Sequence, residues 1–160
     1  MDQAPDVNLH RIERTQTIAL TIAKAFEFFA IPRNLERLTP GFVHFRFLAP
    51  PPERISPGTV LEYRLRLYGL PIKWRTRIVS VDEPGGFVDV QDRGPYAHWQ
   101  HTHTFREIAP GRTEVGDRVE FAMPYGALGE LAYDLVVARS LEQIFDYRAA
   151  ALERLFGAPQ

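Results

Sequence analysis

The chain has 160 residues, of which 45% are apolar and 24% charged, with 19 basic residues against 20 acidic ones and no cysteine. This length is typical of one domain, and the composition is that of a globular protein with its own core. The net charge of −1 argues against a nucleic-acid binder, which normally carries a basic surplus. Without cysteine there are no disulfides, iron–sulfur clusters, thiol nucleophiles or cysteine-bound zinc.

The sequence contains no apolar segment of the length needed for a signal peptide or a membrane span. We therefore expect a cytoplasmic protein with no stable membrane insertion. No linker, internal repeat or low-complexity block divides the chain, so residues 1–160 are predicted to form a single domain.

The N-terminal part predicts one strand followed by two short helices. The strand is expected over residues 10–19, and the helices over 22–30 and 33–38. Pro32 separates the two helices because proline cannot continue a helix. Thr21 is a candidate N-cap for the first of them.

Apolar and polar residues alternate strictly over residues 59–67 and again over 72–78, which predicts a hairpin. A tight turn at Gly69-Leu70 would pair Leu67 with Ile72 and Leu65 with Trp74. Tyr63 and Trp74 would then share the apolar face. The opposite face would carry a strip of five basic residues, Arg64, Arg66, Lys73, Arg75 and Arg77, with Arg66 opposite Lys73 and Arg64 opposite Arg75.

Four further strands are predicted from segments bounded by proline and glycine. They cover residues 42–48, 86–92, 96–106 and 113–122. The register of residues 86–92 is open, so Asp89 and Gln91 either point inward or lie on an exposed edge.

From Ala127 to Phe156 the apolar period becomes helical. Its stripe comprises Leu128, Leu131, Leu135, Leu141, Phe145, Leu152 and Phe156. A helix of this length would lie across the whole sheet. The fold class is therefore α+β, with a curved antiparallel sheet of about seven strands wrapped around one long C-terminal helix, an arrangement that leaves a cavity between them.

This order of elements, together with several short motifs, resembles the START-like (SRPBCC) helix-grip superfamily and its bacterial polyketide cyclase/dehydrase-like group. The resemblance rests on Pro32-Arg33-Asn34-Leu35, Leu38-Thr39-Pro40, Gly69-Leu70-Pro71-Ile72-Lys73-Trp74, Phe87, Asp89, Gln91, Gly94-Pro95-Tyr96, Trp99, His101, His103, Phe105, Asp117, Val119, Pro124 and Gly126. It implies a helix-grip fold with a cavity for a hydrophobic ligand. It implies little about a reaction, because this superfamily hosts carriers, receptors and enzymes.

The densest polar motif is a strand segment in which Trp99, His101, His103 and Phe105 face the same side. If the following turn centres on Pro110, His103 lies opposite Asp117, His101 opposite Val119 and Trp99 opposite Phe121. A slip of two residues would place Asp117 opposite His101 instead. A His–Asp pair fixes the imidazole tautomer and favours its charged form, as a general base or a ligand anchor requires.

The same pair has two other interpretations. Its hydrogen bonds satisfy buried polar groups in a wide sheet, or His101, His103 and Asp117 form the His–His–carboxylate set of a metal site. We predict no metal and no cofactor, because helix-grip proteins are mostly metal-free and the flanking tryptophan crowds the position.

We expect the protein to bind a small lipid-, polyketide- or aromatic-like molecule, as a monomer or homodimer. The predicted ligand-binding residues are Tyr63, Leu65, Trp74, Trp99, His101, His103, Asp117, Phe121, Leu135 and Phe145. One alternative is a cyclase or dehydratase in which His103, paired with Asp117, removes a proton and Tyr63 donates one. The other is a regulatory interaction module that uses the basic strip.

Overall fold

The structure is a computed structural model that describes residues 8–157. Seven antiparallel strands form one sheet in the order β1-β7-β6-β5-β4-β3-β2. The strands are β1 (Leu9–Ile18), β2 (Arg46–Phe47), β3 (Val60–Leu67), β4 (Leu70–Asp82), β5 (Gly86–Arg93), β6 (His98–Ala109) and β7 (Arg112–Ala122). The helices are α1 (Ile22–Ala30), α2 (Leu35–Leu38), α3 (Gly126–Ala132) and α4 (Ala138–Phe156), with short 3₁₀ helices at Pro32–Asn34 and Gly41–Val43 and a π-helical turn at Tyr133–Val137.

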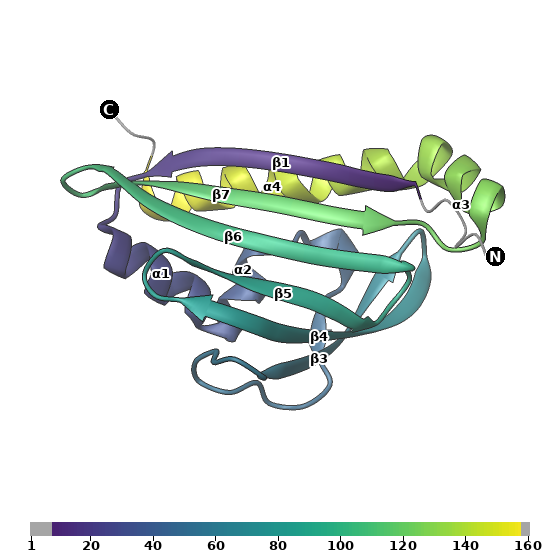
Figure 1. Ribbon diagram of the computed structural model, residues 1–160, viewed down its shortest axis with the longest axis horizontal. Coiled ribbons are helices and arrows are strands. Elements are labelled where there is room, and N and C mark those ends of the chain that lie inside the picture. The colour runs from purple at the N-terminus through teal and green to yellow at the C-terminus, as the bar shows by residue number, and fades with distance from the viewer. Residues whose placement is uncertain (1–7, 158–160) are drawn as a thin grey trace, which may run out of the picture.

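The sheet is curved, and α4 runs along one of its faces (Figure 1). The short helices α1 and α2 lie between β1 and β2 in the chain, and α2 contacts α4. The predicted fold class, a helix-grip α+β domain, is confirmed. None of the helices within residues 8–157 is long and apolar enough to cross a membrane.

Helix α1 begins where the sequence predicts, because Thr21 caps it. The Thr21 hydroxyl accepts a hydrogen bond from the backbone N–H of Lys24 at 3.4 Å, which satisfies one of the free donors of the first turn. The buried face of α1 presents Phe26 and Phe29, and both rings contact Phe105 of β6. This aromatic contact fixes α1 against the sheet.

The predicted hairpin of β3 and β4 forms, but its register differs from the prediction by two residues. Leu67 pairs with Leu70, Leu65 with Ile72 and Tyr63 with Trp74. The turn is Tyr68-Gly69, both with positive φ, as a tight two-residue hairpin turn requires. A turn shifted by one position moves every pair along the ladder by two.

This register also changes the environment of the basic strip. Glu62, rather than Arg64, lies opposite Arg75, and their side chains form an ion pair at 3.8 Å. Arg77 makes a bidentate ion pair with Asp92 of β5. Two of the five basic residues are therefore neutralised within the sheet surface itself, and Arg64 faces Lys73.

The strand predicted over residues 42–48 is wrong in extent, because only Arg46–Phe47 pairs with the sheet. Gly41–Val43 forms a 3₁₀ helix instead, and His44 follows it with a φ of 49°. Val43 is buried by this bend. Alternation of apolar residues over so short a segment does not distinguish a strand from a helical turn.

The C-terminal helix is also interrupted where the sequence predicts one continuous helix. The π-helical turn at Tyr133–Val137 separates α3 from α4, and α3 lies at one end of the sheet (Figure 1). Leu128 and Leu135 are 70% exposed, whereas Leu141 is 5% exposed. The apolar stripe therefore packs on the sheet only within α4.

Candidate functional site

A cavity of about 210 Å³ lies between the sheet and α4. Its wall is mainly aliphatic and aromatic, and it includes both tryptophans of the chain, Trp74 and Trp99. The ring of Trp99 meets that of Trp74 edge-on at 5.1 Å between centroids. Such a wall buries apolar ligand surface and disfavours water.

The cavity wall includes seven of the predicted ligand-binding residues: Tyr63, Leu65, Trp74, Trp99, His101, His103 and Phe145. Three others lie elsewhere. Asp117 sits behind the histidines, beside a separate hollow of about 50 Å³. Phe121 is fully buried in the core, and Leu135 is exposed because the π-helical turn carries it away from the sheet.

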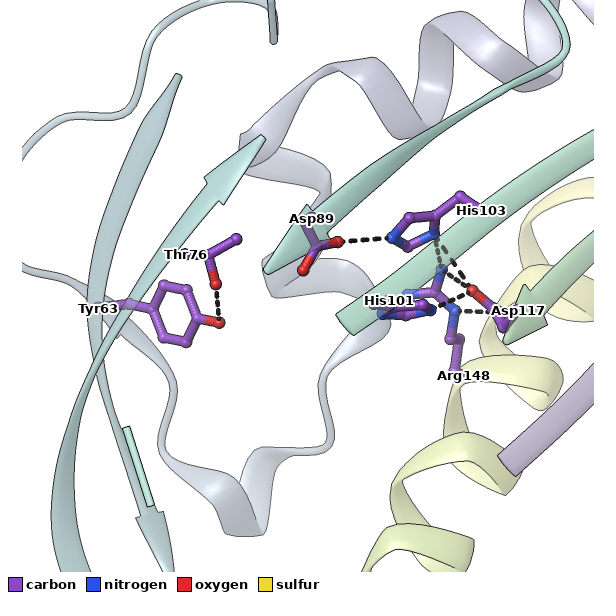
Figure 2. Close-up of polar contacts among 7 residues, drawn as sticks. All are labelled: Tyr63, Thr76, Asp89, His101, His103, Asp117 and Arg148. Atoms are coloured by element: carbon purple, nitrogen blue, oxygen red, sulfur yellow. Dashed lines mark hydrogen bonds and ion pairs between the residues drawn. The ribbon is translucent and has the colours of Figure 1, made fainter. Parts of the chain in front are cut away.

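His103 lies between two carboxylates (Figure 2). Its Nε2 is 2.9 Å from Oδ2 of Asp89, and its Nδ1 is 3.2 Å from Oδ1 of Asp117. Strands β6 and β7 place His103 opposite Asp117, so the predicted register is confirmed. Phe87 stacks on one side of the imidazole at 4.1 Å, and His101 contacts it at 3.8 Å.

This environment holds a proton on His103. Burial alone would lower the pKa of the imidazole, but hydrogen bonds to Asp117 and Asp89 outweigh it and raise the pKa above its ordinary value. An ionised carboxylate only accepts hydrogen bonds, so Nε2 of His103 donates to Asp89, while Nδ1 lies within ion-pair distance of Asp117 and 3.4 Å from Nη2 of Arg148. The two carboxylates therefore favour the imidazolium form of His103.

Asp117 is the centre of the polar cluster. Both of its oxygens bind Arg148 of α4, at 3.0 Å from Nε and 2.9 Å from Nη2. Burial raises the pKa of the Asp117 carboxyl, but Arg148 and both histidines overcome this effect and hold the pKa well below its usual range. The pair is bidentate and buried, which is the stronger geometry for an ion pair.

Sequence reasoning did not identify Arg148, although its position in the helix offers an indication. Arg148 lies three residues after Phe145 and four before Leu152, on the buried face of α4. A charged residue within an apolar helical stripe requires a partner inside the protein. Its guanidinium also lies 5.1 Å from the ring centre of Phe29.

His101 has the opposite protonation preference. Its Nε2 lies 2.9 Å from Oδ1 of Asp117. Burial and the neighbouring charge of His103 lower the pKa of His101, and these effects exceed the opposing effect of the carboxylates. The pKa values of the two stacked histidines are thus shifted in opposite directions, which favours the charged form of His103 and the neutral form of His101.

Asp89 points inward, which resolves the open register of the strand predicted over residues 86–92. In β4–β5 the pairing shifts between Ile78 and Ser80, so that Asp89 pairs with Ile78. On the other side Asp89 pairs with His101 and Phe87 with His103. A Cβ at Gly86 would collide with the His103 carbonyl oxygen, so glycine permits the close approach of β5 to β6 here.

Tyr63 lies on a different part of the cavity wall from the histidine cluster (Figure 2). Its hydroxyl shares a hydrogen bond of 3.0 Å with the Thr76 hydroxyl. Burial raises the pKa of Tyr63, so the phenol stays protonated. Among residues 8–157, no hydrogen bond joins Tyr63 to His103.

Within residues 8–157, one group of side chains has ligand atoms spaced for a metal ion. Asp89, His101 and His103 each offer one such atom, and these atoms lie within 4.8 Å of one another. The set differs from the predicted one, in which Asp117 was the carboxylate. The arrangement fits a cation poorly, because His103 already donates to Asp89 and the guanidinium of Arg148 lies 3.4 Å from His103 Nδ1.

A curved antiparallel sheet gripping a C-terminal helix, with a cavity between them, defines the SRPBCC helix-grip superfamily. Residues 10–157 match the family described as polyketide cyclase/dehydrase and lipid transport, and the chain belongs to this family. No curated protein sequence matches the chain significantly.

Solved structures show the same fold at low sequence identity. The Zhui aromatase/cyclase from Streptomyces sp. R1128 is 16% identical with a TM-score of 0.65, covering 92% of this chain and 96% of that one. Norcoclaurine synthase from Thalictrum flavum, in complex with dopamine and hydroxybenzaldehyde, is 11% identical with a TM-score of 0.66, covering 96% and 94%. Protein Ms6760 from Mycobacterium smegmatis is 19% identical with a TM-score of 0.64, covering 91% and 89%.

Proposed function

We propose that this protein binds a small hydrophobic molecule in the cavity between the sheet and α4. The observation that carries the proposal is the cavity itself, about 210 Å³ with a predominantly apolar wall and a polar cluster on one side. A largely apolar pocket with a few convergent polar groups is the usual form of a small-molecule site.

The aromatic side chains of the wall support an aromatic or polycyclic ligand. Tyr63, Trp74 and Trp99 form a continuous series of ring contacts, and Phe145 of α4 lines the same cavity. Flat rings stack or pack edge-on with such side chains. The similar norcoclaurine synthase structure contains dopamine and hydroxybenzaldehyde, which are small aromatic molecules.

The test is titration with N-phenyl-1-naphthylamine, a neutral probe whose emission rises in apolar surroundings. We expect saturable binding of one probe per chain, with energy transfer from tryptophan, because both tryptophans lie in the cavity wall. Native mass spectrometry of freshly purified protein would complement the probe titration. A ligand retained from the cell adds a few hundred daltons to the native mass, and this added mass is lost on denaturation. Absence of saturable binding would refute the proposal.

A space-filling variant locates the binding site. Leu65→Trp fills the cavity from β3 and should abolish probe binding. Leu128→Trp is the matched control, because Leu128 is 70% exposed on α3, and it should bind the probe as the wild type does. Equal binding by both variants would place the probe outside the cavity.

A second candidate is a cyclase or dehydratase, favoured by the buried histidine–carboxylate cluster on the cavity wall. In this arrangement both nitrogens of His103 face carboxylates, so we assign the proton-abstracting role of this candidate to His101 rather than to His103. The assay is turnover of a poly-β-ketone mimic. Loss of turnover in His101→Gln would support the candidate, and unchanged turnover would refute it.

A further inference from the structure

We propose that Nδ1 of His101 accepts a hydrogen bond from a hydroxyl group of the ligand, so that the cavity selects neutral phenol- or enol-type molecules. The inference rests on the proposed ligand-binding function and specifies its chemistry. It concerns the polar end of the cavity, where β5, β6 and α4 meet.

The tautomer of His101 follows from its contact with Asp117. This carboxylate is ionised, since it already binds Arg148 through both oxygens, and an ionised carboxylate is only an acceptor. The His101 nitrogen at 2.9 Å from it, Nε2, must therefore carry the proton. In a neutral imidazole the other nitrogen is then an acceptor, which makes Nδ1 a lone-pair site.

This acceptor is unused and open. Within residues 8–157, no hydrogen bond engages His101 Nδ1, and the side-chain polar atoms that are both sealed from solvent and unpartnered there are Gln16 Oε1 and Trp74 Nε1. His101 lines the cavity, whereas Asp117 lies outside its wall. Nε2 of His101 is directed at Asp117 (Figure 2), and because His101 lines the cavity, Nδ1 is the ring nitrogen left for a ligand.

The charges of the cluster favour a neutral ligand. Asp89 and Asp117 offset the guanidinium of Arg148 and the imidazolium form that they favour on His103, and the surroundings of His101 favour its neutral form. The donors that would hold a carboxylate ligand are already engaged, because Arg148 binds Asp117 twice and His103 binds both aspartates. A charged ligand would lose its hydration without gaining a free partner of opposite sign.

The apolar side chains around His101 indicate a second property of the ligand, a flat ring that carries the hydroxyl. The ring of Phe145 meets His101 at 5.9 Å between centroids and an angle of 65°, and Trp99 precedes His101 by two residues on the same face of β6. A hydroxyl attached directly to a flat ring places its hydrogen at Nδ1 while the ring packs among these side chains. Phenols and cyclic enols have this form.

The test compares three probes of nearly the same shape by isothermal titration calorimetry at neutral pH. 2-Naphthol offers a hydroxyl donor, 2-methoxynaphthalene has the oxygen without the hydrogen, and 2-naphthoate is an anion. We expect 2-naphthol to bind about tenfold more tightly than 2-methoxynaphthalene, the effect of one hydrogen bond of about 1.4 kcal/mol. 2-Naphthoate should bind more weakly than either.

The variant His101→Phe removes the acceptor and keeps a ring on His103. It should bind 2-naphthol and 2-methoxynaphthalene with equal affinity. The control is His98→Phe, the same change at an exposed position of the same strand, and it should keep the tenfold preference. A preference that survives in His101→Phe would overturn the assignment.

A measurement on the wild type covers the case in which His101→Phe does not fold. With ¹⁵N-labelled histidine, the Nδ1 resonance of His101 should move upfield on addition of 2-naphthol and stay in place with 2-methoxynaphthalene. Equal binding of both neutral probes, or tightest binding of 2-naphthoate, refutes the hydroxyl site while ligand binding stands. Failure of all three probes and of N-phenyl-1-naphthylamine refutes the proposed function itself.

Discussion

His103 and His101 illustrate how neighbouring side chains set protonation within a few ångströms. The two rings are in contact, with centroids 3.8 Å apart, and they cannot both be charged without repulsion. His103 has two carboxylate partners and His101 has one. The surroundings therefore favour the charge on His103 and the neutral form of His101.

The pH dependence of stability should report this charge. The pKa of His103 is raised in the folded state, so its contribution to stability is fully present below the unfolded pKa of about 6.5 and is lost as pH rises through the folded pKa. We expect the difference in unfolding free energy between the wild type and His103→Gln to be larger at pH 6 than at pH 9, measured by urea denaturation. A difference independent of pH would contradict a charged His103.

The Asp117–Arg148 ion pair should dominate the stability of the same region. Arg148→Met leaves a buried carboxylate without its cation, and we expect a loss of about 3–5 kcal/mol in urea denaturation. Arg118→Met is the control, because the ion pair of Arg118 with Glu120 is exposed and should contribute little to stability. Similar losses of unfolding free energy in both variants would mean that the buried ion pair stabilises the protein no more than the exposed one.

At the scale of the elements, the π-helical turn decides which leucines belong to the core. Leu135 within the turn and Leu141 in α4 both follow the apolar period of the sequence, yet Leu135 is exposed and Leu141 is buried against the cavity. An insertion in the helical hydrogen-bond ladder rotates the residues that precede it relative to those that follow. Apolar residues with the same periodicity are therefore exposed at the turn and buried in α4.

The identical substitution at these two positions tests this difference. Leu141→Ala should destabilise the protein by about 2–5 kcal/mol, as a buried leucine does. Leu135→Ala should change stability by no more than about 0.5 kcal/mol, as an exposed position does. Thermal or urea unfolding of both variants measures the difference, and equal losses would mean that α3 and the turn pack on the core.

At the scale of the whole molecule, the cavity links ligand binding to folding. A ligand that binds only the folded state at 100 times its Kd adds about 2.7 kcal/mol of stability. For a chain of this size that corresponds to a rise in Tm of roughly 5–10 °C. We expect 2-naphthol to produce such a rise in the wild type and none in Leu65→Trp, measured by differential scanning calorimetry. A rise in both would place the ligand outside the cavity.

Much of this architecture is encoded locally and was predictable. The alternation in β3 and β4 assigns Tyr63 and Trp74 to the inner face, since successive strand residues point to opposite sides. The two-residue turn Pro110-Gly111, together with a register shift between Glu107 and Ala109, sets the β6–β7 pairing in which His103 lies opposite Asp117 as predicted. Both inferences depend on residues close together in the chain.

The sequence by itself therefore determined the fold class and the inner faces of the strands, and it offered the pairing of His103 with Asp117 as one of two registers. Only the tertiary structure decided that Asp89 is the second partner of His103, because shifts in the β4–β5 pairing set the course of β5. It also brought Arg148 to Asp117 and turned Leu135 to the surface, since both depend on how the C-terminal helix lies on the sheet. Periodicity identifies the face of an element that is buried, but the partner that covers it comes from a distant part of the chain.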